Sequence, residues 1–266
     1  MSIQYNHMKQ TFYVLLCAFG LLPNTIFGRE NDSLQNHFAE GLSLISGLSY
    51  CSIKDEFISN EKYSGSSMNY LFRWSKFHES YMYDLRMEVI SSAKVKNNTI
   101  SANVTDFNLN LTYGYPVGTV DVFGKQMNFF IGPYPELYFH YRSQNIASGG
   151  AAIIDAYSVA FLFSLGAKAY AYLPLNEEIL FSGELSTNLI SLGGKFIDPR
   201  DKENSMIKLL TVFAGTRFST QYAVTYKLSD FLSVGGGYRF NVTRITAWDS
   251  LIFASDNFFL SATMKF

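Results

Sequence analysis

Apolar and polar residues alternate along most of the chain beyond residue 35, and clusters of Gly, Pro, Asn, Asp and Ser interrupt this alternation. The last segment is the clearest case, with apolar residues at every second position from Phe258 to Phe266. Successive residues of a β-strand point to opposite faces. The pattern therefore predicts strands with one apolar face, and no segment has the period of an amphipathic helix.

Ten strands are predicted, at residues 38–51, 68–74, 81–89, 107–115, 127–141, 157–173, 179–189, 210–228, 232–242 and 258–266. Segments 157–173 and 210–228 are long, but each keeps its apolar residues on one parity throughout. A slip by one residue would exchange the faces, so each is predicted to be one strand. A turn hidden in either would raise the total to twelve. The polar segments Ser52–Gly65 and Gly193–Asn204 are predicted to be loops.

Composition narrows the class of protein. Charged residues make up 16% of the chain, below the roughly 25% of ordinary soluble domains, while aromatic residues reach 17%. The formal net charge of -1 excludes the basic field of a general nucleic-acid binder. Apolar runs of about 20 residues, which a helical membrane protein needs, are missing, whereas a membrane β-barrel needs strands that are only half apolar. The alternative is a soluble β-sandwich or calycin-like barrel.

The C-terminal strand, with Phe258, Leu260, Met264 and Phe266 on one face, resembles the assembly signal of Gram-negative outer-membrane β-barrels. The segment 226–240, with its polar turn at 228–231, resembles a periplasmic hairpin of the same superfamily. The resemblance implies an all-β, antiparallel, up-and-down transmembrane barrel with both termini in the periplasm. Its expected partners are outer-membrane lipid, lipopolysaccharide and the assembly machinery, which would read the last strand. The oligomeric state stays open.

Residues 1–28 have the pattern of a cleaved signal peptide, which leaves residues 29–266 as the barrel domain. Lys9 supplies the positive charge, and Phe12–Leu22 is an apolar core of the right length. A membrane anchor and a lipid-modified Cys17 are the alternatives; the apolar run is too short for the first. Loss of the leader leaves only Cys51, so no disulfide is predicted.

Nearly all mid-strand charges fall on the polar parity, which predicts that they face the lumen. The predicted lumen residues are Arg73, Asp84, Arg86, Glu88, Glu136, Tyr138, His140, Arg142, Glu184, Arg217, Lys227 and Arg239. Each Lys or Arg on the lipid face near the midplane would cost about 2–4 kcal/mol. In a narrow ten-stranded barrel these groups either pair across the interior or form a charge-selective constriction.

The segment Gly132-Pro133-Tyr134-Pro135 predicts a bend, because proline removes hydrogen-bond donors from a strand. The bend would lie beside Glu136 and His140. A lipid hydrolase of the phospholipase or lipid A deacylase type is therefore one hypothesis, with His140 as base, Glu136 or Asp155 orienting it and Ser143 as nucleophile. Outer-membrane lipid hydrolases place the serine two residues after the histidine, whereas here the spacing is three.

The leading functional hypothesis is a channel or structural barrel without catalytic activity, cofactor or bound metal. The four histidines are scattered without metal-ligand spacing. The lipid hydrolase is the second hypothesis. The third is a surface-loop binding or adhesion protein, in which residues 193–204 contact the partner.

Overall fold

The computed structural model describes residues 40–266, except 57–58, 79, 98–100, 149–151, 198–206 and 249. The predicted signal peptide lies outside these residues. The strands are β1 (Glu40–Asp55), β2 (Ser59–His78), β3 (Tyr81–Lys96), β4 (Ser101–Val122), β5 (Lys125–Ser148), β6 (Ala152–Pro174), β7 (Ile179–Ile197), β8 (Lys208–Thr211), β9 (Gly215–Lys227), β10 (Leu232–Ile245) and β11 (Leu251–Lys265). The described part of the chain contains no helix long and apolar enough to cross a bilayer.

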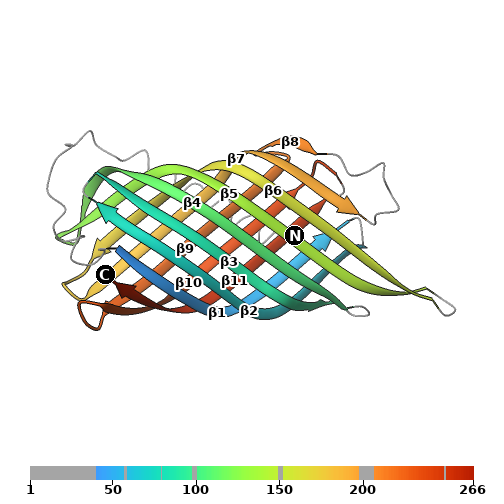
Figure 1. The fold of residues 1–266 in the computed structure, drawn as a ribbon, viewed down its shortest axis with the longest axis horizontal. Coiled ribbons are helices and arrows are strands. Elements are labelled where there is room, and N and C mark those ends of the chain that lie inside the picture. The colour runs from blue at the N-terminus through green and yellow to red at the C-terminus, as the bar shows by residue number, and fades with distance from the viewer. Residues whose placement is uncertain are drawn as a thin grey trace. The chain divides into compact units, whose positions relative to one another are not determined.

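Ten of these strands close into an antiparallel barrel (Figure 1). Strands adjacent in sequence pair from β1 to β7, then β7 pairs with β9, and β9, β10 and β11 continue the ring. β11 pairs with β1 from Gly41↔Lys265 to Asp55↔Leu251, which closes it. The predicted all-β class, antiparallel topology and ten-strand count are confirmed, and residues 157–173 lie in the single strand β6.

The prediction of one uninterrupted strand over residues 210–228 is wrong. A turn at 212–214 separates β8 from β9. Both strands pair antiparallel to β7, one after the other along its length, so together they occupy a single place in the ring. Leu210 is buried, although the predicted phase places it on the outer face with Tyr222 and Val224, which are exposed. The interruption reverses the phase without reversing the chain direction. Parity alone therefore concealed it.

Of the segment Ser52–Gly65, predicted to be a loop, residues 52–55 extend β1 and residues 59–65 belong to β2. Strand β1 runs to Asp55, and Lys54 lies opposite Lys62 of β2. The inward-facing Ile53 and Tyr63 are both fully buried. An antiparallel sheet needs apolar side chains on only one face, so these strands can pair although their outer face is polar. The high polar content of this segment was therefore mistaken for loop composition.

The predicted bend in the fifth strand is also absent. β5 pairs with β6 from Asn128 to Ser148 without a register shift, and Pro133 faces outward. Its pairing with β4 skips residues 132–135, where the prolines lack donors. At Gly132 a side chain would overlap the Tyr113 carbonyl, so glycine permits this close approach. The irregularity lies in β4 instead, between Pro116 and Gly118.

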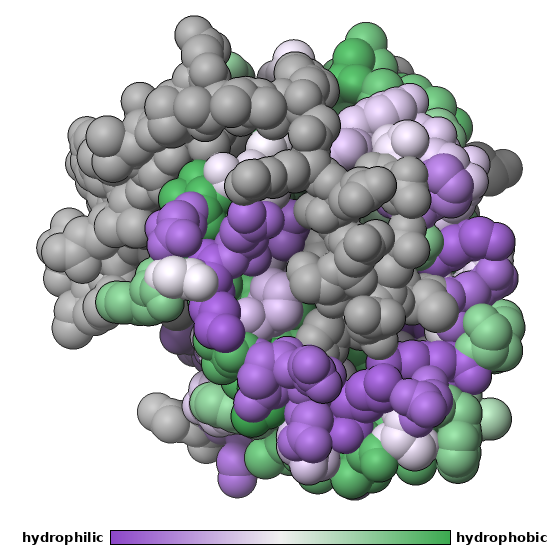
Figure 2. Space-filling view, turned by 90° about the vertical axis from the view of Figure 1, so that its left-hand side faces the viewer, coloured by the Kyte–Doolittle hydropathy of each residue, from purple (hydrophilic) through white to green (hydrophobic). Residues whose placement is uncertain are grey.

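The outer face of the barrel is strongly apolar, and the inner positions are buried. Leu44, Phe258 and Leu260 are 63%, 66% and 75% exposed, respectively. Figure 2 views the end of the barrel that holds the C-terminus, here called the C-terminal end; hydrophilic residues gather there and hydrophobic residues lie along its outer edge. The opposite end is called the loop end. Ordinary soluble proteins rarely expose so continuous an apolar surface.

Membrane barrels carry a girdle of aromatic side chains on the outer wall at each edge of the apolar band. At the C-terminal end, the aromatic residues near strand ends include Tyr113, Tyr115, Tyr172, Tyr226 and Phe266. Tyr113 contacts the rings of Tyr81, Tyr83 and Tyr115 in such a cluster. Tyr172, in contrast, is fully buried inside the barrel. It lies on the parity opposite to the outward positions of β6, so the alternation itself excludes it from the girdle.

Candidate functional site

The candidate site is the lumen, because the buried polar side chains converge there from all sides of the barrel. Along the barrel axis its contents form three layers. An apolar cluster lies toward the C-terminal end, charged and polar groups occupy the middle, and a larger apolar cluster lies toward the loop end.

Five charged residues, called the central network, connect opposite walls. They are Arg73 of β2, Asp84 and Arg86 of β3, Lys168 of β6 and Glu184 of β7. Asp84 accepts ion pairs from Arg73 Nε at 2.7 Å, Arg86 Nη2 at 2.6 Å and Lys168 Nζ at 3.2 Å. Glu184 receives Arg86 Nη2 at 2.6 Å and Lys168 Nζ at 3.5 Å. Three cations thus share two carboxylates across the lumen.

Tyrosines tie the central network to the C-terminal layer. The hydroxyl of Tyr170 donates to Asp84 Oδ2 at 2.7 Å, and Arg73 Nη2 donates to the Tyr172 hydroxyl at 3.4 Å. The Tyr172 ring meets Phe77 edge to face, with the ring centroids 5.2 Å apart. The apolar cluster at this end comprises Phe77, Met82, Phe130, Tyr170, Tyr172 and Leu180. Aromatic rings therefore fill the lumen between the central network and the C-terminal end.

A second ion pair joins Arg217 of β9 to Glu136 of β5, with Arg217 Nε 2.8 Å from Glu136 Oε1. Tyr134 and Asn108 also donate hydrogen bonds to Glu136. The guanidinium of Arg217 lies 4.3 Å from the centre of the Tyr138 ring. This cation–π contact stabilises the guanidinium. Because Tyr138 also belongs to the loop-end apolar cluster, it connects the polar middle layer to that cluster.

Glu88 of β3 is held by residues of two other strands, the neighbouring β2 and the more distant β10. Asn69 donates to Glu88 at 2.6 Å, and Arg239 Nη2 lies 3.1 Å from Glu88 Oε1. Asn241 makes a longer contact of 3.5 Å. The central network, the Arg217–Glu136 pair and the Arg239–Glu88 pair together place a charged residue from most strands in the middle layer.

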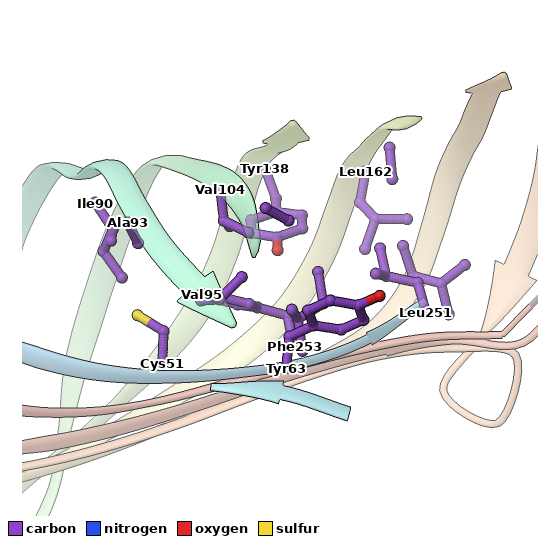
Figure 3. Close-up of a cluster of buried hydrophobic side chains, with 14 of the residues drawn as sticks. Cys51, Tyr63, Ile90, Ala93, Val95, Val104, Tyr138, Leu162, Leu251 and Phe253 are labelled. Atoms are coloured by element: carbon purple, nitrogen blue, oxygen red, sulfur yellow. The ribbon is translucent and has the colours of Figure 1, made fainter. Parts of the chain in front are cut away.

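The loop-end layer is an apolar plug rather than an aqueous vestibule (Figure 3). It contains Cys51, Ile53, Tyr63, Ile90, Ala93, Val95, Ala102, Val104, Tyr138, Ala160, Leu162, Leu210, Ile245, Leu251 and Phe253. Figure 3 shows these side chains pointing toward one another from several strands. Further out, Lys195 Nζ lies 2.8 Å from Asp55 Oδ1, and both are fully buried.

A small cavity lies among the charged side chains of the middle layer. A cavity of about 20 Å³ is lined by residues that include Arg86, Lys168, Arg217 and Arg239. That volume holds about one water molecule. A path for hydrated ions would have to break several ion pairs and displace both apolar layers.

The described side chains among the proposed lipid-hydrolase residues lie at different places on β5 and have different partners. His140 is fully buried, and its Nδ1 lies 3.3 Å from Asp106 Oδ1. Ser143 has the opposite parity on β5, on the outer face where Tyr141 also lies. Glu136 is engaged by Arg217. Asp155 lies opposite Asn145 in β6, and its side chain is outside the described part of the chain.

The remaining predicted lumen residues occupy two kinds of position. Arg142 is fully buried, packs 4.3 Å from the centre of the Tyr63 ring and donates to Gln144 at 2.6 Å. Lys227, in contrast, lies at the C-terminal end, where its Nζ pairs with the exposed Asp230 at 2.6 Å. It is the last residue of β9, next to the turn that leads to β10, and is not part of the central network.

Four buried ionic residues were not predicted. Lys168 alternates with the outward-facing Ala167 and Ala169, so the parity rule would have identified it. Asp106 likewise precedes the first outward position that was assigned to its strand. Asp55 and Lys195 fall in segments that were predicted to be loops. Because residues 52–55 continue β1 and residues 193–197 continue β7, both side chains can be placed inside the barrel.

Solved structures that are similar to this chain include two outer-membrane barrels. One is the outer membrane protease OmpT from Escherichia coli, with a TM-score of 0.51 and 8% identity, covering 85% of this chain and 96% of that chain. The other is the translocator domain of the autotransporter NalP from Neisseria meningitidis, with a TM-score of 0.50 and 10% identity, covering 99% and 97%. No protein-family model matches the sequence, and no curated protein is similar to it in sequence.

The similarity at these identities concerns the fold, and both barrels are matched over nearly their whole length. It agrees with the closed ring and the apolar outer face. The chain therefore has the fold of the Gram-negative outer-membrane β-barrels.

Proposed function

We propose that the protein is a non-conducting barrel of the Gram-negative outer membrane that acts through its outer surface and its loop end. The ion pairs and apolar clusters inside the barrel support this proposal. The central network joins β2 and β3 to β6 and β7, and an apolar layer lies on each side of it. A barrel filled in this way serves as a rigid membrane support rather than as a solute path.

The membrane assignment is supported by the exposed apolar face. Exposure of side chains such as Leu44 and Leu260 to water is unfavourable, whereas their contact with acyl chains is favourable. OmpT, with which the chain shares its fold, is an outer membrane protease. No catalytic activity is carried over from that protein.

We further propose that the C-terminal end faces the periplasm. Connections at this end are short, for example residues 123–124 between β4 and β5. Those at the loop end include residues 198–207 between β7 and β8. Outer-membrane barrels have short periplasmic turns and longer external loops. Phe258, Leu260, Met264 and Phe266 would then be presented to the assembly machinery on the periplasmic side.

Planar-bilayer recording tests the closed lumen. The purified mature protein, reconstituted at single-molecule density, is expected to give no conductance steps, while an open porin in the same bilayers gives them. Reproducible ohmic steps from the wild-type protein would overturn the proposal, because the ion pairs would then leave a continuous aqueous path.

Cysteine labelling of intact cells tests the orientation. A membrane-impermeant maleimide is expected to label Lys62→Cys at the loop end but not Lys125→Cys at the C-terminal end. The matched control is permeabilised cells, in which both variants react. The native Cys51 is fully buried and gives no background. The reverse labelling pattern would show that the barrel is inserted the other way.

A second candidate function is partner binding at the loop end, and the strand lengths favour it. β4, β5 and β6 have 22, 24 and 23 residues, whereas about 9–11 cross a membrane. At the loop end of β4, Ser101 and Asn103 point outward and are exposed. The barrel therefore continues beyond the apolar band as a polar structure available to partners.

Shortening the connection between β7 and β8 tests this second function. Cells that express the full chain are compared with cells that lack residues 199–205 for adhesion to immobilised glycans and extracellular-matrix proteins. Loss of adhesion with an unchanged amount of folded barrel supports binding at this end. Equal adhesion by both cell types contradicts it. The lipid-hydrolase alternative has no such support, because His140 and Ser143 lie on opposite faces of β5.

A further inference from the structure

Five basic side chains form a patch on the outer wall of the barrel near the loop end. The basic patch consists of Lys54 of β1, Lys62 of β2, Lys94 and Lys96 of β3, and Arg244 of β10. Their strands, together with β11, lie side by side in the ring (Figure 1). All five have outward parity, and Lys62, Lys94, Lys96 and Arg244 are exposed.

The strand registers bring these cations close together. Arg244 and Lys54 lie opposite Ile252 of β11 from its two sides, and Lys54 lies directly opposite Lys62. Lys94 and Lys96 lie opposite Ser66 and Ser64, which are four and two residues from Lys62 along β2. Strands are about 4.8 Å apart, so the patch extends for roughly 19 Å around the wall.

Like charges in directly opposed positions destabilise a sheet when nothing neutralises them. Lys54 is compensated by Glu56, whose carboxylate lies 2.9 Å from Lys54 Nζ. The hydrogen bond from Lys54 lowers the pKa of Glu56, which keeps this carboxyl ionised. Glu61 is the other nearby acid, and it accepts a hydrogen bond from Asn97.

The other four cations of the patch have no ion pair or side-chain hydrogen bond within the described residues of the barrel. This distinguishes them from the cations of the central network, each of which contacts a carboxylate. An array of opposed, uncompensated cations matches a ligand that carries several anionic groups on one molecule.

The patch also has a defined height and side. On β1 the exposed apolar positions end at Tyr50, and Lys54 follows four residues later. On β4 and β5 the outward positions at the same end are uncharged, as at Asn103 and Ser143. The cations therefore gather on one side of the barrel, immediately beyond the band that would contact acyl chains.

We propose that the basic patch binds the phosphate groups of a lipopolysaccharide molecule whose acyl chains pack on the apolar band below it. Lipopolysaccharide carries several phosphates on one headgroup, which suits cations spread over neighbouring strands. The inference rests on the proposed orientation, because only the outer leaflet supplies this lipid at the loop end. Lys62, Lys94, Lys96 and Arg244 supply the phosphate contacts, and Lys54 contributes to the field.

The test compares two fourfold variants of the full mature protein in detergent. In the patch variant, Lys62, Lys94, Lys96 and Arg244 are each replaced by Gln. In the control variant, Lys76, Lys125, Lys227 and Lys265 at the C-terminal end are each replaced by Gln, which removes the same charge. Binding of purified lipopolysaccharide, of enzymatically dephosphorylated lipopolysaccharide and of phosphatidylglycerol is measured by thermophoresis at low and high salt.

The patch variant is expected to bind phosphorylated lipopolysaccharide at least tenfold more weakly than the wild type, and the control variant within twofold of it. Dephosphorylated lipopolysaccharide should bind wild type and patch variant equally, and added salt should reduce only the phosphate-dependent affinity. Equal affinity of the patch variant and the wild type overturns the proposal. Equal binding of phosphatidylglycerol by the wild type overturns the choice of lipopolysaccharide.

These measurements are independent of conductance and of labelling in cells. A conducting or inverted barrel would fail the earlier tests while its patch still bound phosphate in detergent. A closed, correctly oriented barrel with no phosphate-dependent binding would retain the proposed function and lose only this inference.

Discussion

The cations of the central network and those of the basic patch share their chemistry but differ in their surroundings. Arg86 inside the barrel contacts both Asp84 and Glu184 at 2.6 Å. Lys62, on the outer wall, lies opposite another lysine. A buried charge is costly unless it is paired, whereas an exposed charge remains solvated. The lumen cations are therefore explained by the fold itself, and the patch cations are left available for an external anion.

Removing an acid from the lumen should produce the largest effect. In Asp84→Ala, the cations Arg73, Arg86 and Lys168 retain only Glu184 as a nearby carboxylate. Leaving buried charges without a partner should lower the free energy of unfolding by about 3–5 kcal/mol. Urea-induced unfolding in phospholipid vesicles, followed by tryptophan fluorescence, measures this change.

The matched control for Asp84→Ala is Asp230→Ala. Asp230 also pairs with a lysine, but its side chain is 98% exposed. Surface ion pairs contribute little because water solvates both partners. If the two variants unfold at the same urea concentration, the lumen carboxylates are not buried as described.

A cation placed on the apolar face should have an intermediate effect. Leu44→Arg introduces a charge on the outer wall where Leu44 is 63% exposed. If this wall contacts hydrocarbon, the change should destabilise the barrel by about 2–4 kcal/mol in vesicles, and Asn103→Arg at the loop end by about 0–1 kcal/mol. Equal stabilities for the two arginine variants would argue for a soluble protein.

Removing one cation of the basic patch should have the smallest effect, and of opposite sign. Lys62→Gln relieves repulsion from Lys54 directly across the ladder. In phosphate-free detergent, the free energy of unfolding should rise by about 0.2–1 kcal/mol. Thermal unfolding with and without lipopolysaccharide measures this change in stability. Added lipopolysaccharide should stabilise the wild type more than it stabilises Lys62→Gln. A loss of stability in the absence of phosphate would contradict the repulsion.

Alternation predicted the faces of the strands well, because the pleat forces successive side chains to opposite sides. It placed Asp84, Glu88 and Arg239 on the inner parity, and all three are buried. It also kept residues 157–173 in one strand. The same rule, applied without exception, would have found Lys168.

Strand ends and irregularities were predicted poorly, because they depend on neighbouring strands. Residues 52–55 are polar enough for a loop, yet pairing with β2 and β11 extends the strand to Asp55. Prolines 133 and 135 lack donors on the side of β4, but unbroken pairing with β6 holds β5 in register. Neither partner is visible in the local sequence.

The sequence by itself determined an all-β chain with one apolar and one polar face per strand, because a period of two is a local property. The tertiary structure decided which charges meet. Arg73 and Glu184 are far apart in the chain, and only closure of the ring brings Arg73 Nη1 to 3.4 Å from Glu184 Oε1. Whether opposed charges fill a lumen or leave a path depends on barrel size and register, which arise only when the last strand pairs with the first.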